Sequence, residues 1–110
     1  MDQEDFAMKI RAAGNAVGKA EFAVLQAEAE EKKIIAQVMV IAEARGAKTN
    51  AHQLRSADED VNVFEARLAK GRARGQLAAA KAEALAAEVE FKIWQSRLAS
   101  ERAERRVYGT

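Results

Sequence analysis

The sequence predicts an all-α protein, an antiparallel coiled-coil hairpin of two long helices that dimerises into a four-helix assembly. Its 110 residues contain no proline, so glycine is the only strong helix breaker present. Hydrophobic residues make up 49% of the chain, and many of them are alanines, which favour helices but bury little area each. Apolar residues also recur at alternating steps of three and four, which is the periodicity of a coiled coil.

The first helix is expected over residues 2–45. Asp2 can cap its start, and Arg45 and Gly46 form the basic last turn and left-handed stop that are typical of a helix C-terminus. Glu31 is the only interruption of its apolar seam. The seam residues are Phe6, Ile10, Ala13, Val17, Ala20, Val24, Ala27, Ile34, Val38 and Ile41.

The second helix is expected over residues 57–106, because Ser56 and Glu59 have the spacing of a capping box. Its seam changes register, because beyond Val89 the first stripe meets Lys92 and Ser96 and a neighbouring stripe takes over. The first stripe is Val61, Phe64, Leu68, Gly71, Gly75, Ala78, Ala82, Leu85 and Val89, and the second is Leu77, Ala80, Ala84, Ala87, Phe91, Trp94 and Leu98. Residues 1–110 then form a single helical domain.

Residues 46–56 are polar and lack heptad register, so a loop is expected there. Whether this loop holds a short helical turn beginning at Thr49 or Asn50 is left open. Because only about ten residues join two long helices, the helices must fold back on each other. Aligning the two seams places Ile41 beside Val61.

Several large apolar residues lie off the seam that joins the two helices. Burying each one contributes about 1.5–3 kcal/mol, so a hairpin that left them in water would be poorly stabilised. We therefore expect self-association, most simply of two hairpins, through Phe22, Leu25, Phe91, Trp94 and Leu98. A monomer whose C-terminal segment folds back as a third helix is the alternative.

The chain lacks the residue constellations that enzymes use. Without cysteine it has no disulfide, no thiol nucleophile and no zinc site of the usual kind. Its carboxylates lie among lysines and arginines, and no Glu-x-x-His pair is present. His52 has no neighbouring nucleophile, and Gly71 and Gly75 lack the Walker pattern. We expect no enzyme activity, cofactor, metal or small-molecule substrate.

The sequence also lacks a membrane signal. No apolar run approaches the roughly 20 residues that span a bilayer, and the acidic N-terminus is unlike a signal peptide. Gly14 and Gly18 form a G-x-x-x-G pattern, but charged residues flank it, so it predicts close helix packing in water. A cytoplasmic protein without a membrane partner is expected.

Charge is unevenly distributed along the chain. Residues 1–60 hold eight Lys and Arg against eleven Asp and Glu, whereas residues 61–110 hold ten against six. The acid-free stretch 66–82 supplies candidate contacts to nucleic-acid phosphates, since basic patches attract nucleic acid. These candidates are Arg67, Lys70, Arg72, Arg74 and Lys81. The alternative is that they are solvated or are neutralised by the acidic first helix.

Two segments resemble known proteins. Gly46-Ala47-Lys48-Thr49 is followed by a polar turn and then by an Ala/Glu/Lys-rich helix that ends in Ser-Arg-Leu-Ala-Ser-Glu-Arg-Ala-Glu at residues 96–104. Residues 46–108 thereby resemble small helical bacteriophage proteins encoded near replication and recombination genes. The resemblance implies an accessory protein in phage DNA metabolism, acting in the host cell, or a small phage factor that acts on a host protein. It carries no catalytic motif.

The function expected from these observations is that of a non-enzymatic helical interaction or accessory protein, with a protein partner that the sequence does not identify. The resemblance places it in phage DNA recombination or replication. One alternative is direct nucleic-acid binding through the basic segment 67–81. Another is an inhibitor of a host defence or regulatory protein, in which the acidic first helix imitates nucleic acid.

Overall fold

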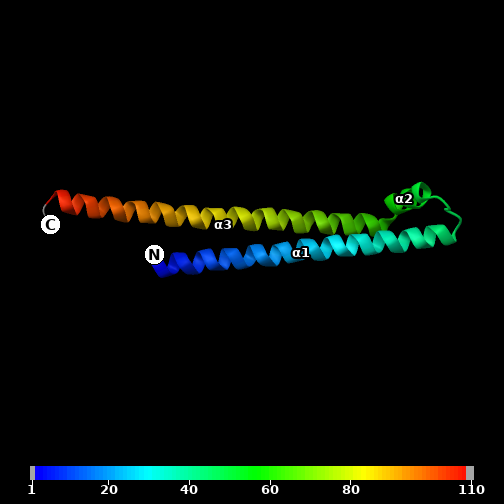
Figure 1. Cartoon of the computed structure of the whole chain (residues 1–110), viewed down its shortest axis with the longest axis horizontal. Helices are drawn as coiled ribbons and strands as arrows, with labels where there is room; N and C mark the ends of the chain where they lie inside the picture. Colours follow the sequence, from blue (N-terminus) through cyan, green and yellow to red (C-terminus); the bar gives the residue numbers. More distant parts are fainter. Residues whose placement is uncertain (1, 109–110) are drawn as a thin grey trace. The chain divides into compact units, whose positions relative to one another are not determined.

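A computed structural model describes residues 2–108 and shows an all-α fold (Figure 1). The helices are α1 (Gln3–Ala44), α2 (Asn50–Glu59) and α3 (Val61–Val107), and residues 2–108 contain no strand. The all-α prediction is therefore confirmed. Within the described part of the chain, none of the helices is both long and apolar enough to cross a membrane.

The chain divides into two compact units, each of which is described by itself. The terminal unit combines residues 2–17 of α1 with residues 79–108 of α3, and the central unit is Gly18–Ala78. Both α1 and α3 contribute a segment to each unit, and α2 belongs to the central unit.

Paired hydrogen bonds define both ends of α1. At its start the Asp5 amide donates to Asp2 Oδ1 and the Asp2 amide donates to Asp5 Oδ2, each at 3.0 Å, which is the reciprocal pattern of a capping box. At its end Gly46 has φ 110°. The Ala47 amide reaches back 2.9 Å to the Ala42 carbonyl, as in a Schellman motif. The helix thus stops at the glycine that the sequence singles out.

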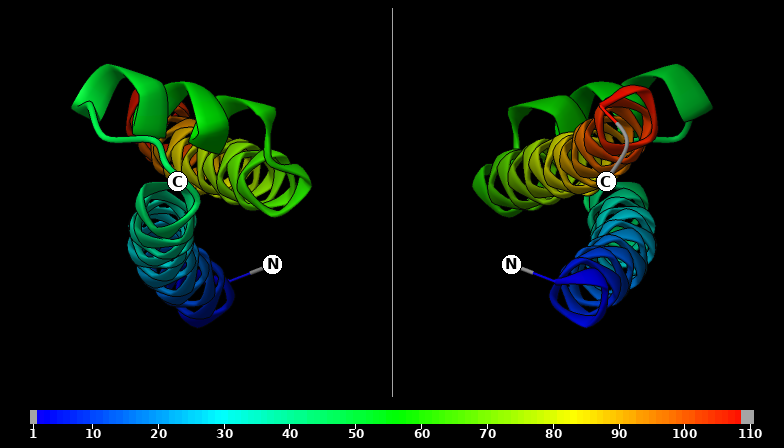
Figure 2. Two further views of the ribbon diagram at one scale, coloured as in Figure 1. Left: turned by 90° about the vertical axis from the view of Figure 1, so that its right-hand side faces the viewer. Right: turned by 90° about the vertical axis from the view of Figure 1, so that its left-hand side faces the viewer.

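The loop expected over residues 46–56 contains a helix, α2, which begins at Asn50 and continues beyond the expected loop to Glu59. Thr49 caps this helix, and its hydroxyl accepts a hydrogen bond of 3.2 Å from the His52 amide. The short helical turn left open by the sequence is therefore a helix of ten residues. The polar composition indicated a loop, but a surface helix of nearly three turns needs few apolar residues. Figure 2 shows α2 from the side and the start of α3 nearly end-on, so α2 runs across α3.

The predicted start of the second long helix is also wrong, because α3 begins at Val61. Ser56 lies inside α2, where its hydroxyl donates to the His52 carbonyl at 3.2 Å, so it caps nothing. Asp60 has extended backbone angles and separates α2 from α3. Its carboxylate accepts hydrogen bonds from the amides of Asn62 and Val63, at 2.8 and 3.2 Å, and so caps α3.

The apolar seam predicted for α1 is confirmed apart from its last member. Its members from Phe6 to Val38 are buried or half-buried, and Glu31 among them is half-buried as well. Ile41 is exposed, and Ala42 is buried in its place. The tight turn after α1 explains this difference, because Ala47 folds back onto Ala42.

The first stripe predicted for the second helix, from Val61 to Val89, is not the buried one. Every member of the set from Val61 to Val89 is exposed. The sheltered residues of α3 form the neighbouring stripe instead, which the sequence analysis began only at Leu77. In the central unit this stripe is Val63, Ala66, Lys70, Ala73 and Leu77, and in the terminal unit it is Ala80, Ala84, Ala87, Phe91, Trp94 and Leu98.

The choice of stripe has a physical reason. Both stripes of α3 keep heptad spacing, so spacing alone does not decide which of them is buried. The structure packs alanines, whose short side chains let helix backbones approach closely over many contacts. Val63 is fully buried and Val61 is 66% exposed, since residues two apart point in nearly opposite directions on a helix.

This packing predicts opposite responses at two alanines of the terminal unit. Ala87→Leu should destabilise the fold by about 1–3 kcal/mol, because Ala87 is 2% exposed and has no room for a larger side chain. Ala82→Leu is the matched control and should change stability by less than about 0.5 kcal/mol, because Ala82 is exposed. Urea denaturation followed by circular dichroism measures both. Equal destabilisation by the two variants would contradict the observed stripe.

Candidate interaction surfaces

An aromatic cluster occupies the terminal unit. The ring of Phe6 lies 5.6 Å from Phe91 and 5.2 Å from Trp94, measured between ring centroids, and Phe91 stacks on Trp94 at 5.9 Å. Phe6 is buried, while Phe91 and Trp94 are half-buried. The expectation that one chain leaves Phe91 and Trp94 in water is therefore wrong, because Phe6 covers them. Leu98 is half-buried as well.

A charged pair lies in the central unit at seam positions of both helices. Glu31 Oε2 and Lys70 Nζ are 2.6 Å apart, and their side chains are only 15% and 22% exposed. Glu31 Oε2 is buried and makes this ion pair without a hydrogen bond of good geometry. In the sequence, Glu31 interrupts the apolar seam of α1 and no partner for it is apparent. Its partner Lys70 is the one charged residue in the buried stripe of α3.

Ion pairs also engage other cations of the basic segment. Arg67 pairs with Asp58 at 2.9 Å and Arg74 pairs with Glu28 at 3.2 Å. With Lys70, three of the five candidate nucleic-acid contacts thus have an acidic partner in the chain. The remaining two, Arg72 and Lys81, are exposed and form no ion pair within residues 2–108.

The pair formed by Glu31 and Lys70 gives a prediction for stability. Lys70→Met should destabilise the fold by about 1–3 kcal/mol, since it leaves a largely buried carboxylate without its cation. Adding Glu31→Met should recover most of the loss, because an apolar pair of similar volume replaces the ionic one. Chemical denaturation measures both steps.

Lys81→Met is the control for that series, because Lys81 is exposed and its replacement should leave the free energy of unfolding nearly unchanged. If Lys70→Met behaves like Lys81→Met, the pair contributes nothing to the fold.

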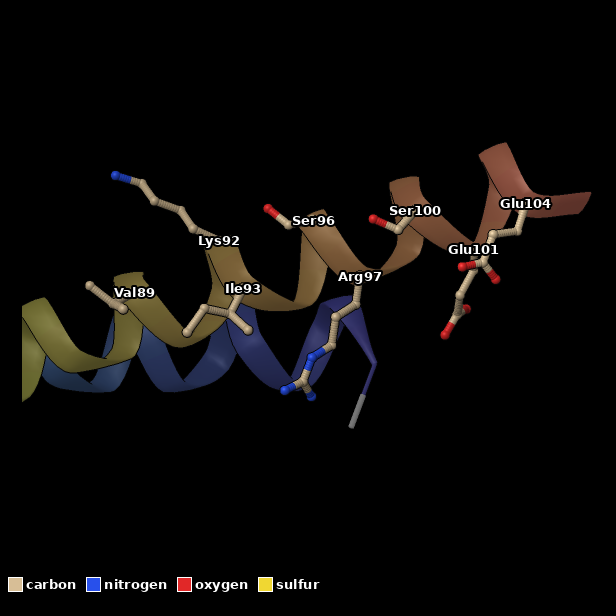
Figure 3. Close-up of a pocket in the computed structure, with 8 residues that line it drawn as sticks. All are labelled: Val89, Lys92, Ile93, Ser96, Arg97, Ser100, Glu101 and Glu104. Atoms are coloured by element: carbon tan, nitrogen blue, oxygen red, sulfur yellow. The ribbon is translucent and has the colours of Figure 1, made fainter. Parts of the chain in front are cut away.

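A groove runs along α3 in the terminal unit (Figure 3). Ser96 and Ser100 project from one side of the helix and Arg97 projects from the other. The lining residues all belong to α3 and are Val89, Lys92, Ile93, Ser96, Arg97, Ser100, Glu101 and Glu104. Val89 and Ile93 are 45% and 49% exposed, so the N-terminal part of the groove is apolar surface.

A second pocket lies in the central unit, where the end of α1 meets α2. His52 and Ser56 line it together with Arg45 and Asp60. The Ser56 hydroxyl is bonded to the His52 carbonyl oxygen, so it is not directed as a nucleophile at the imidazole. Asp60 is engaged in capping α3. Over the described residues, no group of three or more His, Cys, Asp or Glu side chains is placed to hold a metal ion.

The outer face of α3 in the central unit is apolar and exposed. Val61 is 66%, Phe64 56% and Leu68 39% exposed, and Gly71 and Gly75 continue their three-and-four spacing. These five residues are called the α3 outer face. It lies opposite the buried stripe of the same helix. Ala82, Leu85 and Val89 repeat the spacing in the terminal unit and are also exposed.

A matching outer face occurs on α1 in the central unit. Phe22 is 61% and Leu25 63% exposed, and Gly18 and Ala29 flank them at the same spacing on the same side of the helix. These four residues are called the α1 outer face. Phe22 and Leu25, predicted as self-association residues, are therefore accessible, in contrast to Phe91 and Trp94.

The glycines on these faces have no role inside the described chain. A Cβ built on Gly18, Gly71 or Gly75 would meet no atom within 4 Å, and the same is true of Gly14. The close helix packing predicted from Gly14 and Gly18 is therefore absent within the chain. A glycine inside a helix costs about 1 kcal/mol relative to alanine, so each position is destabilising without an internal benefit.

Comparison with known proteins gives no identification. No protein family, curated protein or solved structure matches this chain. The resemblance of residues 46–108 to small bacteriophage proteins stays a prediction. The geometry itself describes a helical protein whose most unusual feature is apolar helix surface at coiled-coil spacing.

Proposed function

We propose that this protein is a non-enzymatic helical interaction protein, which acts by offering the outer faces of α1 and α3 to other helices. The α3 outer face carries the proposal. Its large apolar side chains keep heptad spacing while they are exposed, which is the pattern of a helix that packs against a partner.

Energetics support an external partner. Burial of each large apolar side chain is worth about 1.5–3 kcal/mol, and Phe64 and Leu68 receive only part of this inside the chain. Surface apolar residues that occur singly need no explanation, but a set aligned along one side of a helix does.

We further propose that the chain is an antiparallel hairpin, which self-associates. Within the terminal unit Lys9 of α1 pairs with Glu90 of α3. Within the central unit Glu28 and Glu31 pair with Arg74 and Lys70, so that residue numbers fall along α1 as they rise along α3. The antiparallel order within each unit supports the hairpin.

The cellular setting is proposed from the resemblance alone. A cytoplasmic accessory role in phage DNA recombination or replication fits a small helical protein that works through protein contacts. Inhibition of a host defence or regulatory protein would use the same surfaces.

The proposed function is tested by affinity capture from a lysate of the protein's native cell. We expect a partner that the wild-type chain retains and the double variant Phe64→Asp, Leu68→Asp loses, since two buried charges disrupt an apolar helix interface. Val40→Asp is the matched control, because Val40 is 66% exposed but lies outside both outer faces. Capture that is the same for all three chains would refute a role for the α3 outer face.

Direct nucleic-acid binding is the second candidate, and the exposure of Arg72 and Lys81 is the observation that favours it. Mobility shift with single- and double-stranded DNA across a salt series tests this function. A shift that weakens with salt and is lost in Arg72→Glu, Lys81→Glu would support it. The absence of any shift near about 50 mM salt would eliminate it.

A further inference from the structure

We propose that the α3 outer face of one copy binds the α1 outer face of a second copy, with the two helices antiparallel. This inference rests on the proposed function and names the partner of the same surfaces. All residues concerned belong to the central unit.

The glycines set the register of this contact. Gly75 of one copy is placed opposite Gly18 of the other, where the absence of both side chains allows the closest approach of the two backbones. Because the helices have equal rise and opposite direction, residues four, seven and eleven positions away on each helix then also meet. The resulting pairs are Gly71 with Phe22, Leu68 with Leu25 and Phe64 with Ala29.

The sizes of these residues are complementary. The Phe22 ring meets the bare backbone of Gly71, and the Phe64 ring meets the small side chain of Ala29. Leu68 and Leu25, which are 39% and 63% exposed in one chain, cover each other. Glycines that destabilise the isolated helix thereby acquire a function, since larger residues at 71 and 75 would hold the second copy away.

Charge selects the α1 face of the second copy as the occupant. In the same register Arg74 approaches Glu21 and Arg67 approaches Glu28 along one flank, in addition to the partners that these arginines have within the chain. Along the other flank Arg72 approaches Lys19, so two pairs of opposite charge stand against one pair of like charge. Docking of the α3 outer face on itself would instead bring Arg72 near Arg72 and Arg74 near Arg74 of the second copy. Like charges at a helix interface disfavour that arrangement.

The contact joins two different surfaces, so it is heterologous. Each copy that uses its α3 outer face still offers a free α1 outer face, and further copies can add in the same way. The expected product is a series of oligomers that grows with concentration, in place of one symmetric dimer.

Two blocked variants test the inference. Gly71→Leu, Gly75→Leu blocks the α3 outer face, and both glycines have open space for a side chain within the chain. Phe22→Asp, Leu25→Asp blocks the α1 outer face. By sedimentation, the wild-type mass should rise with concentration, and each variant alone should stay at the 12.0 kDa of one chain. An equimolar mixture of the two should form one complex of twice that mass that does not grow.

Any of the following outcomes would overturn the inference. A wild-type chain that is monomeric at all concentrations shows that no second copy binds. Self-association that survives only the α3 block points to contact between two α1 faces, and self-association that survives only the α1 block points to contact between two α3 faces. A mixture that does not combine excludes the heterologous contact. Val40→Asp is the control and should associate as the wild type does.

A charge exchange keeps the inference falsifiable if a blocked variant does not fold. Glu21→Lys should weaken self-association by about fivefold, and adding Arg74→Glu in the same chain should restore it. Failure of the second change to rescue the first overturns the register.

Affinity capture separates this inference from the proposed function. A monomeric chain that still retains a different protein through Phe64 and Leu68 refutes self-binding and leaves the interaction function intact. A chain whose α3 outer face affects neither self-association nor capture refutes both.

Discussion

The contact between α1 and α3 through small side chains is the constraint on which the rest of the structure depends. Alanines such as Ala66, Ala73 and Ala87 line the buried stripe of α3, and they bring helices close without giving them a strong preference for one register. Each unit therefore adds a larger feature to its seam. In the terminal unit it is the aromatic cluster around Phe6, and in the central unit it is the ion pair of Glu31 with Lys70.

The burial of the alanine stripe also determines which residues of α3 are exposed. A helix can direct only one stripe toward a given neighbour, so burial of the alanine stripe turns Val61, Phe64 and Leu68 toward solvent. The same geometry leaves Gly71 and Gly75 in open space. Apolar surface, glycines without an internal role and mostly basic flanking residues then occur together on one side of α3. The proposal of a function through helix surfaces rests on this combination.

The basic segment illustrates how tertiary structure changes the meaning of a charge pattern. In the sequence, residues 66–82 form an uninterrupted basic stretch. In the fold, Lys70 and Arg74 reach acids of α1, and Arg67 reaches Asp58 in α2. The uneven charge of the two halves is therefore used in part to join them. Residue counts along the chain do not reveal such pairing, because the partners are separated by up to 46 positions.

The sequence by itself determined the all-α class, the apolar seam of α1 and the stop at Gly46, because helix periodicity and left-handed glycine are local properties. Only the tertiary structure decided which of two heptad stripes on α3 is buried. Both stripes satisfy the local pattern, and the choice depends on partners far away in the chain, Phe6 and Glu31. The helix at residues 50–59 also escaped prediction, since Asp60 separates it from α3 through a cap that competes with the Ser56 signal.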